Sequence, residues 1–218
     1  RAVDDSVLST TNLKLEKVKF LQSNSITETG WIQFFERSPT LTDITLSNHF
    51  RSVTDKVVSA ILSHCAVTSL DISQCSATTG KCFLDILDIS PPPAATTNLK
   101  HLDISKLRLE SGALLALSSF VNLSELKLLH GNVKSVELLQ MTAACRNLET
   151  LHVYEGMSAG VIMHVLKRSN VKNLVYNQSK LPTKIVTDIV DLNMKSISRV
   201  LTPSATFLLL NESTCESR

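Results

Sequence analysis

Residues 99–104 read Leu-Lys-His-Leu-Asp-Ile, and residues 123–128 read Leu-Ser-Glu-Leu-Lys-Leu. Both stretches carry an aliphatic residue at the first, fourth and sixth positions. The same apolar pattern begins at five further residues: Leu15, Leu41, Val67, Leu148 and Val171. Successive starts are 26, 26, 32, 24, 25 and 23 residues apart. Self-similarity at a nearly fixed period predicts a repeat protein, in which each unit buries its apolar face only by stacking on its neighbours.

Each unit has the pattern of a short strand followed by a turn and a helix. Alternate side chains of a strand point to opposite faces, so the fourth and sixth positions share one face. A turn is expected three residues beyond the sixth position, at His49, Cys75, Leu107, Gly131, Gly156 and Ser179. Apolar residues at helical spacing then follow within 57–62, 114–120, 136–143, 161–166 and 185–189. Stacked units of this kind place a parallel sheet against a layer of helices.

Details of the units lead to three further expectations. Two of the predicted helices have buried faces that include Leu115 and Val136. An asparagine recurs before the next strand, at Asn98, Asn122, Asn147 and Asn170, and suits a tight turn because Asn tolerates unusual backbone dihedrals. The longest step contains Pro91-Pro92-Pro93, so residues 90–97 are predicted to form a solvated loop inserted into the repeat.

The repeated pattern resembles the leucine-rich-repeat family over residues 13 to 181. The unit length and Cys75 at a turn position are similar to the ribonuclease-inhibitor-like and cysteine-containing types. The resemblance implies an α/β solenoid of about seven to eight repeats, with a curved parallel sheet on the concave face and helices on the convex face. It also implies a protein-binding domain that is not an enzyme and holds no cofactor.

The repeats also resemble the repeat domains of F-box and ZYG-11-like ubiquitin-ligase substrate receptors. By resemblance, the domain would recognise a substrate for a cullin-type ubiquitin ligase, and a cullin adaptor would bind segments outside this chain. The alternative is a non-ligase scaffold or regulator that binds a protein partner through the same face. An extracellular receptor domain would need terminal disulfide caps, for which the cysteines are not placed.

The pattern predicts one domain over residues 1–218. Residues 1–12 are expected to cap the first repeat, residues 13–191 to form the repeats, and residues 192–218 to form a C-terminal cap or tail. We expect the seventh helix over 185–192 and a final strand over 205–210 that covers the open end of the core.

The composition is that of a globular protein, with 43% of the 218 residues hydrophobic and 19% charged. The 22 basic and 20 acidic side chains leave a net charge of +2, so neither a nucleic acid nor an anionic membrane is the expected partner. No apolar run approaches the roughly 18 residues of a membrane span. The polar N-terminus is unlike a signal peptide, and the first residue is Arg instead of Met, from which we expect a fragment of a longer protein.

The five cysteines indicate reduced thiols instead of a disulfide scaffold or a zinc site. They stand at positions 65, 75, 82, 145 and 215, without a Cys-x-x-Cys pair. Reduced, buried thiols favour a cytoplasmic or nuclear location.

Side chains at the third, fifth and seventh positions of each unit are predicted to face the concave surface. There Lys127, Leu129, His152 and Tyr154 are expected to anchor a protein or peptide, because apolar and aromatic side chains beside charge are typical of interface centres. Asp71 and Asp103 are expected to select a basic segment of that ligand, and His101 lies on the same face. His101 and His152 lie two strands apart, about 9–10 Å at sheet spacing, so no metal site is predicted. The alternative is an ordinary solvated sheet face.

Overall fold

The computed structural model describes residues 4–10, 14–21, 23, 25–49, 51–129, 133–153, 157–176, 199–202 and 205–208. Its strands are β1 (Lys17–Lys19), β2 (Asp43–Thr45), β3 (Ser69–Asp71), β4 (His101–Asp103), β5 (Glu125–Leu128), β6 (Thr150–Val153), β7 (Asn173–Tyr176), β8 (Arg199–Thr202) and β9 (Ala205–Leu208). Its helices are α1 (Asp5–Thr10), α2 (Glu28–Glu36), α3 (Asp55–His64), α4 (Lys81–Asp85), α5 (Ala95–Asn98), α6 (Ala113–Ala116), α7 (Ser135–Ala144) and α8 (Ala159–Arg168), with 3-10 turns η1 (Ile86–Asp88) and η2 (Leu117–Ser119).

The strands form one sheet in which sequence order and spatial order are the same. β1 to β8 pair in parallel, and β9 pairs antiparallel with β8 at the edge. Equivalent positions of the repeats stand side by side in the ladder, so that Asp43, Ser69, His101 and Glu125 form one row. The predicted register is therefore confirmed for the first seven strands.

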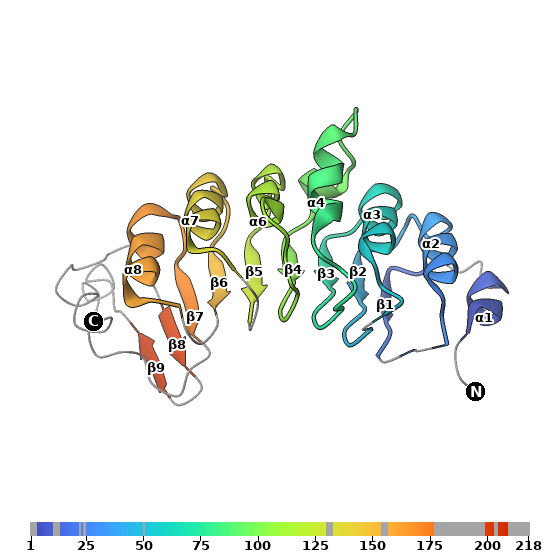
Figure 1. The fold of residues 1–218 in the computed structure, drawn as a ribbon, viewed down its shortest axis with the longest axis horizontal. Helices are drawn as coiled ribbons and strands as arrows, with labels where there is room; N and C mark the ends of the chain where they lie inside the picture. Colours follow the sequence, from blue (N-terminus) through green and yellow to red (C-terminus); the bar gives the residue numbers. More distant parts are fainter. Residues whose placement is uncertain are drawn as a thin grey trace, which may run out of the picture.

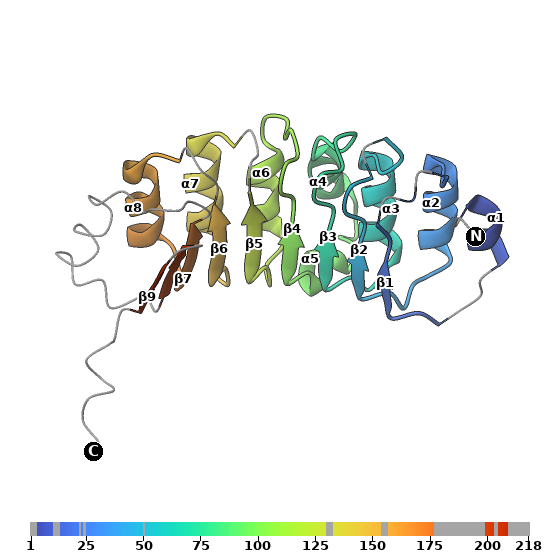
Figure 2. The same cartoon turned by 90° about the horizontal axis from the view of Figure 1, so that it is seen from below.

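The helices cover one face of the sheet, and the stack bends into an arc with the sheet on its inner side (Figures 1 and 2). The bend has a simple cause, because neighbouring strands lie about 4.8 Å apart while packed helices need about 8–10 Å between their axes. The strand side must then be the shorter side. The architecture is that of a leucine-rich-repeat solenoid, as the repeat pattern predicts.

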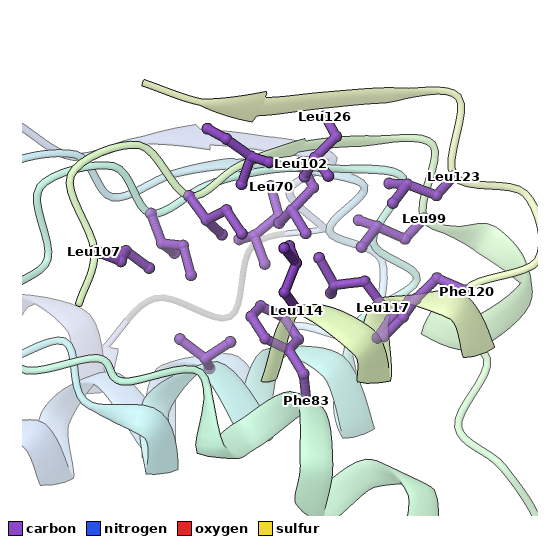
Figure 3. Close-up of a cluster of buried hydrophobic side chains, with 14 of the residues drawn as sticks. Leu70, Phe83, Leu99, Leu102, Leu107, Leu114, Leu117, Phe120, Leu123 and Leu126 are labelled. Carbon is purple, nitrogen blue, oxygen red and sulfur yellow. The ribbon is translucent and has the colours of Figure 1, made fainter. Parts of the chain in front are cut away.

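The core lies between the two layers and is built from the repeated apolar positions. From the second unit on, the first, fourth and sixth positions are buried: Leu41, Ile44, Leu46, Val67, Leu70, Ile72, Leu99, Leu102, Ile104, Leu123, Leu126, Leu128, Leu148, Leu151, Val153, Val171, Leu174 and Tyr176. In the middle of the molecule, Leu70, Leu102 and Leu126 point from their strands toward Phe83 and Leu114 of the helical layer (Figure 3).

The turn position holds buried side chains that join one unit to the preceding one. The thiol of Cys75 donates to the carbonyl of Leu46 over 3.0 Å, and Nε2 of His49 lies 3.2 Å from the carbonyl of Phe20. Both carbonyls belong to the sixth position of the previous unit. Leu107 is buried there without such a bond. This position therefore selects for a buried side chain, and in two units for one that satisfies a strand-end carbonyl.

Three of the four repeated asparagines act through side-chain hydrogen bonds, which corrects the expectation based on their dihedral freedom. The side-chain amide of Asn122 donates to the carbonyl of Thr97 over 2.7 Å, and that of Asn147 donates to the carbonyl of Val121 over 2.8 Å. Asn170 donates to the carbonyl of Arg146 in the same way. Positive φ angles occur elsewhere, after three consecutive strands, at Asn48, Gln74 and Lys106.

Two predicted helical faces are wrong in part. Val136 is 65% exposed and Leu115 is 38% exposed, whereas Leu138 and Met141 form the buried face of α7. The segment 114–120 is divided into α6 and η2. The predicted loop over 90–97 is also interrupted, because α5 begins at Ala95, which is buried. Figure 1 shows α4 and the turn after it rising above the row of helices.

An acidic residue at the start of one helix reaches the start of the next helix in three successive units. The carboxylate of Asp5 accepts bonds from the backbone and side chain of Thr27, at 2.9 and 2.7 Å. Glu28 accepts a 2.6 Å bond from the hydroxyl of Thr54. Asp55 accepts bonds from the backbone and hydroxyl of Thr79, both at 2.9 Å. Each of these three residues thereby supplies an acceptor to groups at the start of the next helix.

The ends of the chain add elements beyond the repeats with the leucine pattern. α1 lies within the predicted N-terminal cap and packs on α2 with Leu8 buried. β9 falls within the strand expected over 205–210, and β8 is a parallel strand that the pattern does not predict. The predicted helix over 185–192 lies outside the described residues, as does Cys215.

The cysteines of the described chain are free and buried, as predicted. Burial raises the pKa of the Cys65 and Cys75 thiols to about 12, and that of Cys145 to about 11. The pKa of the Cys82 thiol is also raised, chiefly by burial. Within the described residues, no helix has the length and apolarity to cross a membrane.

Candidate concave binding site

The strand register brings most of the predicted site residues together on the concave face. Asp71, Asp103, Lys127 and His152 stand in one row across β3, β4, β5 and β6. His101 lies in the neighbouring row on β4, and Leu129 follows the end of β5. Tyr154 lies outside the described residues.

A hollow of about 210 Å³ lies over the central strands. Its lining consists of Ser69, Leu70, Asp71, His101, Leu102, Asp103, Glu125 and Lys127. Pockets for drug-sized ligands have volumes of about 300–1,000 Å³, so this hollow has the scale of a single side chain. Three carboxylates against one lysine make its lining acidic when His101, the histidine of the lining, is neutral.

Glu125 is the centre of the charged network, although the sequence analysis does not select it. One carboxylate oxygen lies 3.1 Å from Nε2 of His152 and 3.4 Å from Nζ of Lys127. The other oxygen lies 3.3 Å from Nδ1 of His101. One side chain on β5 thus contacts titratable groups on three adjacent strands.

The pKa values of this network reflect both burial and charge. Burial raises the pKa of Glu125, but the combined attraction of Lys127, His152 and His101 outweighs it and leaves the pKa below the ordinary carboxyl value. Burial and the charge of Lys127 lower the pKa of His152, while Glu125 and Asp103 oppose that effect in part. At neutral pH the network therefore contains an ionised Glu125 and a neutral His152.

Asp71 and Asp103 have a backbone role in addition to their charge. One oxygen of Asp71 accepts a 2.9 Å bond from the amide of Ser73, and Asp103 does the same with the amide of Ser105. These bonds close a turn where each strand ends. Within the part of the chain that the structure describes, neither carboxylate has a cationic partner in an ion pair.

The arrangement is suited to binding a charged group and gives no sign of a metal centre. Within the described ranges, no group of three or more His, Cys, Asp or Glu side chains could hold a metal ion. Although His101 and His152 share a carboxylate, they contact opposite oxygens of it. The buried hydroxyl of Ser105 accepts a bond from the amide of Leu129, which ties the two strand ends together.

Glu125 could have been identified from the predicted strand register. It occupies the third position of its unit, so the register places it directly beside His101 and diagonally across from His152. Opposite charges in such positions on one sheet face attract each other. The sequence pattern of apolar and aromatic side chains beside charge instead favours Leu129 and Tyr154.

Comparison with known proteins gives a distant structural likeness. The sequence matches no protein-family model and no curated protein. Among solved structures, the leucine-rich repeat-containing protein LegL7 from Legionella pneumophila is 15% identical, with a TM-score of 0.43 over 91% of this chain and 77% of that chain. The fold assignment rests on the register of the strands and the buried columns of the present chain.

Proposed function

We propose that this domain binds a protein partner through its concave face, and that a basic segment of the partner lies over β3 to β5. The observation that carries the proposal is the acidic hollow on a sheet face that no helix covers in the described part of the chain (Figures 1 and 2). Asp71 and Asp103 line that hollow without a cation of their own among the described residues.

The neighbouring strands supply the other part of the proposed interface. Lys127 and His152 stand in the same row, and Leu129 follows β5 half-buried. We include Tyr154, which follows β6 in the sequence, as an aromatic anchor of the same surface. A sheet held by a continuous parallel ladder is preformed, so the partner binds with little rearrangement of the domain.

On the resemblance of the repeats to F-box and ZYG-11-like receptors, we further propose that the bound protein is a substrate of a cullin-type ubiquitin ligase. The cullin adaptor would then bind segments outside this chain. A scaffold or regulator without ligase function is the alternative, and it uses the same concave face. The ligase and scaffold functions differ in whether cullin and adaptor subunits are bound together with the partner, and this difference can be measured.

The test is affinity purification of the full-length protein from cells, followed by mass spectrometry. The variant Asp71→Asn/Asp103→Asn removes two charges while an amide oxygen still accepts the turn bonds. The matched control Asp85→Asn/Asp88→Asn removes two exposed charges from α4 and η1 on the helical side. We expect one protein to be captured by the wild type and the control and lost from the concave variant. A Leu129→Ala/Tyr154→Ala variant should lose the same protein.

Cullin and adaptor subunits in all samples would support the ligase role. Their absence from the wild-type sample, with the partner still present, would support the scaffold alternative. A partner retained in full by both concave variants would refute binding at this face.

A further inference from the structure

The network around Glu125 fixes one side of the concave hollow. Its two oxygens contact three side chains from β4, β5 and β6, at distances from 3.1 to 3.4 Å. Glu125 is half-buried, so these contacts are less screened by solvent than those of a fully exposed pair. The carboxylate therefore contacts Lys127 and both imidazole rings at once.

The other side of the hollow has a different charge environment. Asp71 and Asp103 stand directly opposite each other on neighbouring strands, where like charges repel. A lysine or arginine side chain placed between them would relieve this repulsion. The volume of the hollow, about 210 Å³, is on the scale of one such side chain.

We infer that Glu125 is a positioning residue that makes the capture of a cationic side chain in this hollow dependent on protons, by holding His152 and His101 where their protonation opposes the incoming cation. The inference rests on the proposed function, because it concerns the same hollow and the same basic segment. It adds Glu125 to the site and assigns the two histidines to regulation instead of direct anchoring.

The pH dependence of cation binding depends on the charged and titratable groups of the strands around the hollow. β3 contributes Asp71, β4 contributes His101 and Asp103, and β5 contributes Glu125 and Lys127. β6 contributes His152 and the uncharged Thr150, and β7 contributes the uncharged Asn173 and Val175. Farther along, Asp43 on β2 pairs with Lys17 at 3.5 Å.

These groups determine whether binding weakens or strengthens as the pH falls. With both histidines neutral, three carboxylates face one lysine, and a cationic ligand is attracted. A proton on His101, which lines the hollow, or on His152, which contacts Glu125 from the neighbouring strand, adds a positive charge near the ligand. Binding should therefore weaken as the pH falls from 7.5 to 5.5, and His152 contributes at the lower end of this range because its pKa lies below the ordinary imidazole value. For charges several ångströms apart near a protein surface, the expected loss is roughly three- to tenfold in affinity.

The first experiment measures binding of a fluorescent, capped hexalysine peptide to the full chain at pH 7.5 and 5.5 and constant ionic strength. We expect weaker binding at pH 5.5 for the wild type and nearly equal binding for His101→Asn/His152→Asn. The matched control is His64→Asn/His164→Asn, which removes two exposed histidines from α3 and α8 and should keep the wild-type pH dependence.

The second experiment follows the imidazole proton resonances of the free protein during a pH titration. Because the carboxylate of Glu125 raises the pKa of His152, the variant Glu125→Gln should shift that titration to lower pH. Glu149→Gln is the control, since Glu149 is exposed and pairs with Lys172. A change that only loosened the fold would not move one histidine selectively.

The outcomes separate this inference from the proposed function. Hexalysine binding that is the same at both pH values would overturn the inference and leave the basic-segment proposal intact. No hexalysine binding at either pH would overturn both. An unchanged His152 titration in Glu125→Gln would refute the role of Glu125 even if the peptide binds.

Discussion

His49 illustrates how one buried polar residue ties the first two units together. Its side chain is 1% exposed and packs edge-on against Trp31, with ring centroids 5.2 Å apart. Its Nε2 reaches the carbonyl of Phe20 in the preceding unit. Burial lowers the pKa of His49, and the backbone carbonyls of Phe20 and Ser23 oppose this only in part. The folded protein therefore holds this imidazole neutral.

Stability should consequently depend on pH through His49. Because its pKa is lower in the folded state, the unfolded chain binds a proton first, and the free energy of unfolding decreases as the pH falls below about 6.5. Urea denaturation at pH 7.5 and 5.5 measures this decrease. We expect a smaller decrease for His49→Gln than for the wild type.

The control for this prediction is His64→Gln, at an exposed position near the end of α3. It should show the wild-type dependence on pH. Equal pH dependence in wild type and His49→Gln would contradict the assignment.

At the scale of single residues, the sequence shows which face of the sheet a side chain points to. It does not show which side chains contact each other. The period-two alternation suffices to place Asp71 and Asp103 on the concave face and Leu102 in the core. It cannot show that Glu125 contacts two histidines, because those contacts depend on side-chain rotamers across three strands. The hydrogen bonds of Asn122 and Asn147 were missed for the same reason, since each acceptor belongs to the preceding unit.

Among the elements, the helices of the N-terminal half depend on one another through their first residues. Asp55, the first residue of α3, accepts bonds from Thr79 and also from the amide of Cys82 in α4, at 3.2 Å. Amides at the start of a helix have no partner within the helix. The beginning of α4 is therefore stabilised from the neighbouring unit.

Replacing this acceptor should destabilise the protein by an amount typical of a lost cap. We expect Asp55→Ala to lower the free energy of unfolding by about 1–3 kcal/mol, because two amides and a hydroxyl lose their acceptor. Asp88→Ala, at an exposed position of η1, should change it by less than about 0.5 kcal/mol. Urea denaturation of both variants decides the matter, and equal effects would argue against the capping role.

For α2 and β8, two of the elements that the sequence pattern does not predict, the reason can be identified. Gly30 lies within α2, where glycine ordinarily disfavours a helix. In the structure the space beside Gly30 is occupied by the carboxylate of Asp5, so a larger side chain would clash. β8 lacks the spaced leucines of the other units and owes its place to pairing with β7. The strands β1 to β7 were predicted correctly because their own spaced apolar residues specify them.

For the molecule as a whole, stability is distributed between neighbours along the stack. Each inner strand pairs with one strand on either side, and elements adjacent in sequence are also adjacent in space. In such an array the free energy is approximately a sum of unit terms and interface terms. Damage to one unit should therefore spread first to the units beside it.

Hydrogen exchange of Leu102→Ala tests this behaviour. The side chain is 1% exposed in the central core, so the substitution should destabilise the protein by about 2–5 kcal/mol. We expect amide protection to fall most in β3, β4 and β5 and least in β1. Leu21→Ala, at a residue that is 56% exposed, is the control and should leave protection unchanged. A uniform loss across all strands would indicate a single cooperative unit instead.

The in-register ladder also fixes the spacing of the side chains that a ligand meets when it lies across the strands. Its rows present one side chain about every 4.8 Å. An extended peptide laid across the strands presents same-side residues about every 6.7 Å. After two such intervals its side chain lies about 4 Å beyond the matching row of the sheet. A helix laid in the same direction advances about 5.4 Å per turn and is out of step by only about 1 Å. A ligand that meets three successive strands with equivalent side chains is therefore commensurate with this surface as a helix, whereas an extended segment can match it at isolated points.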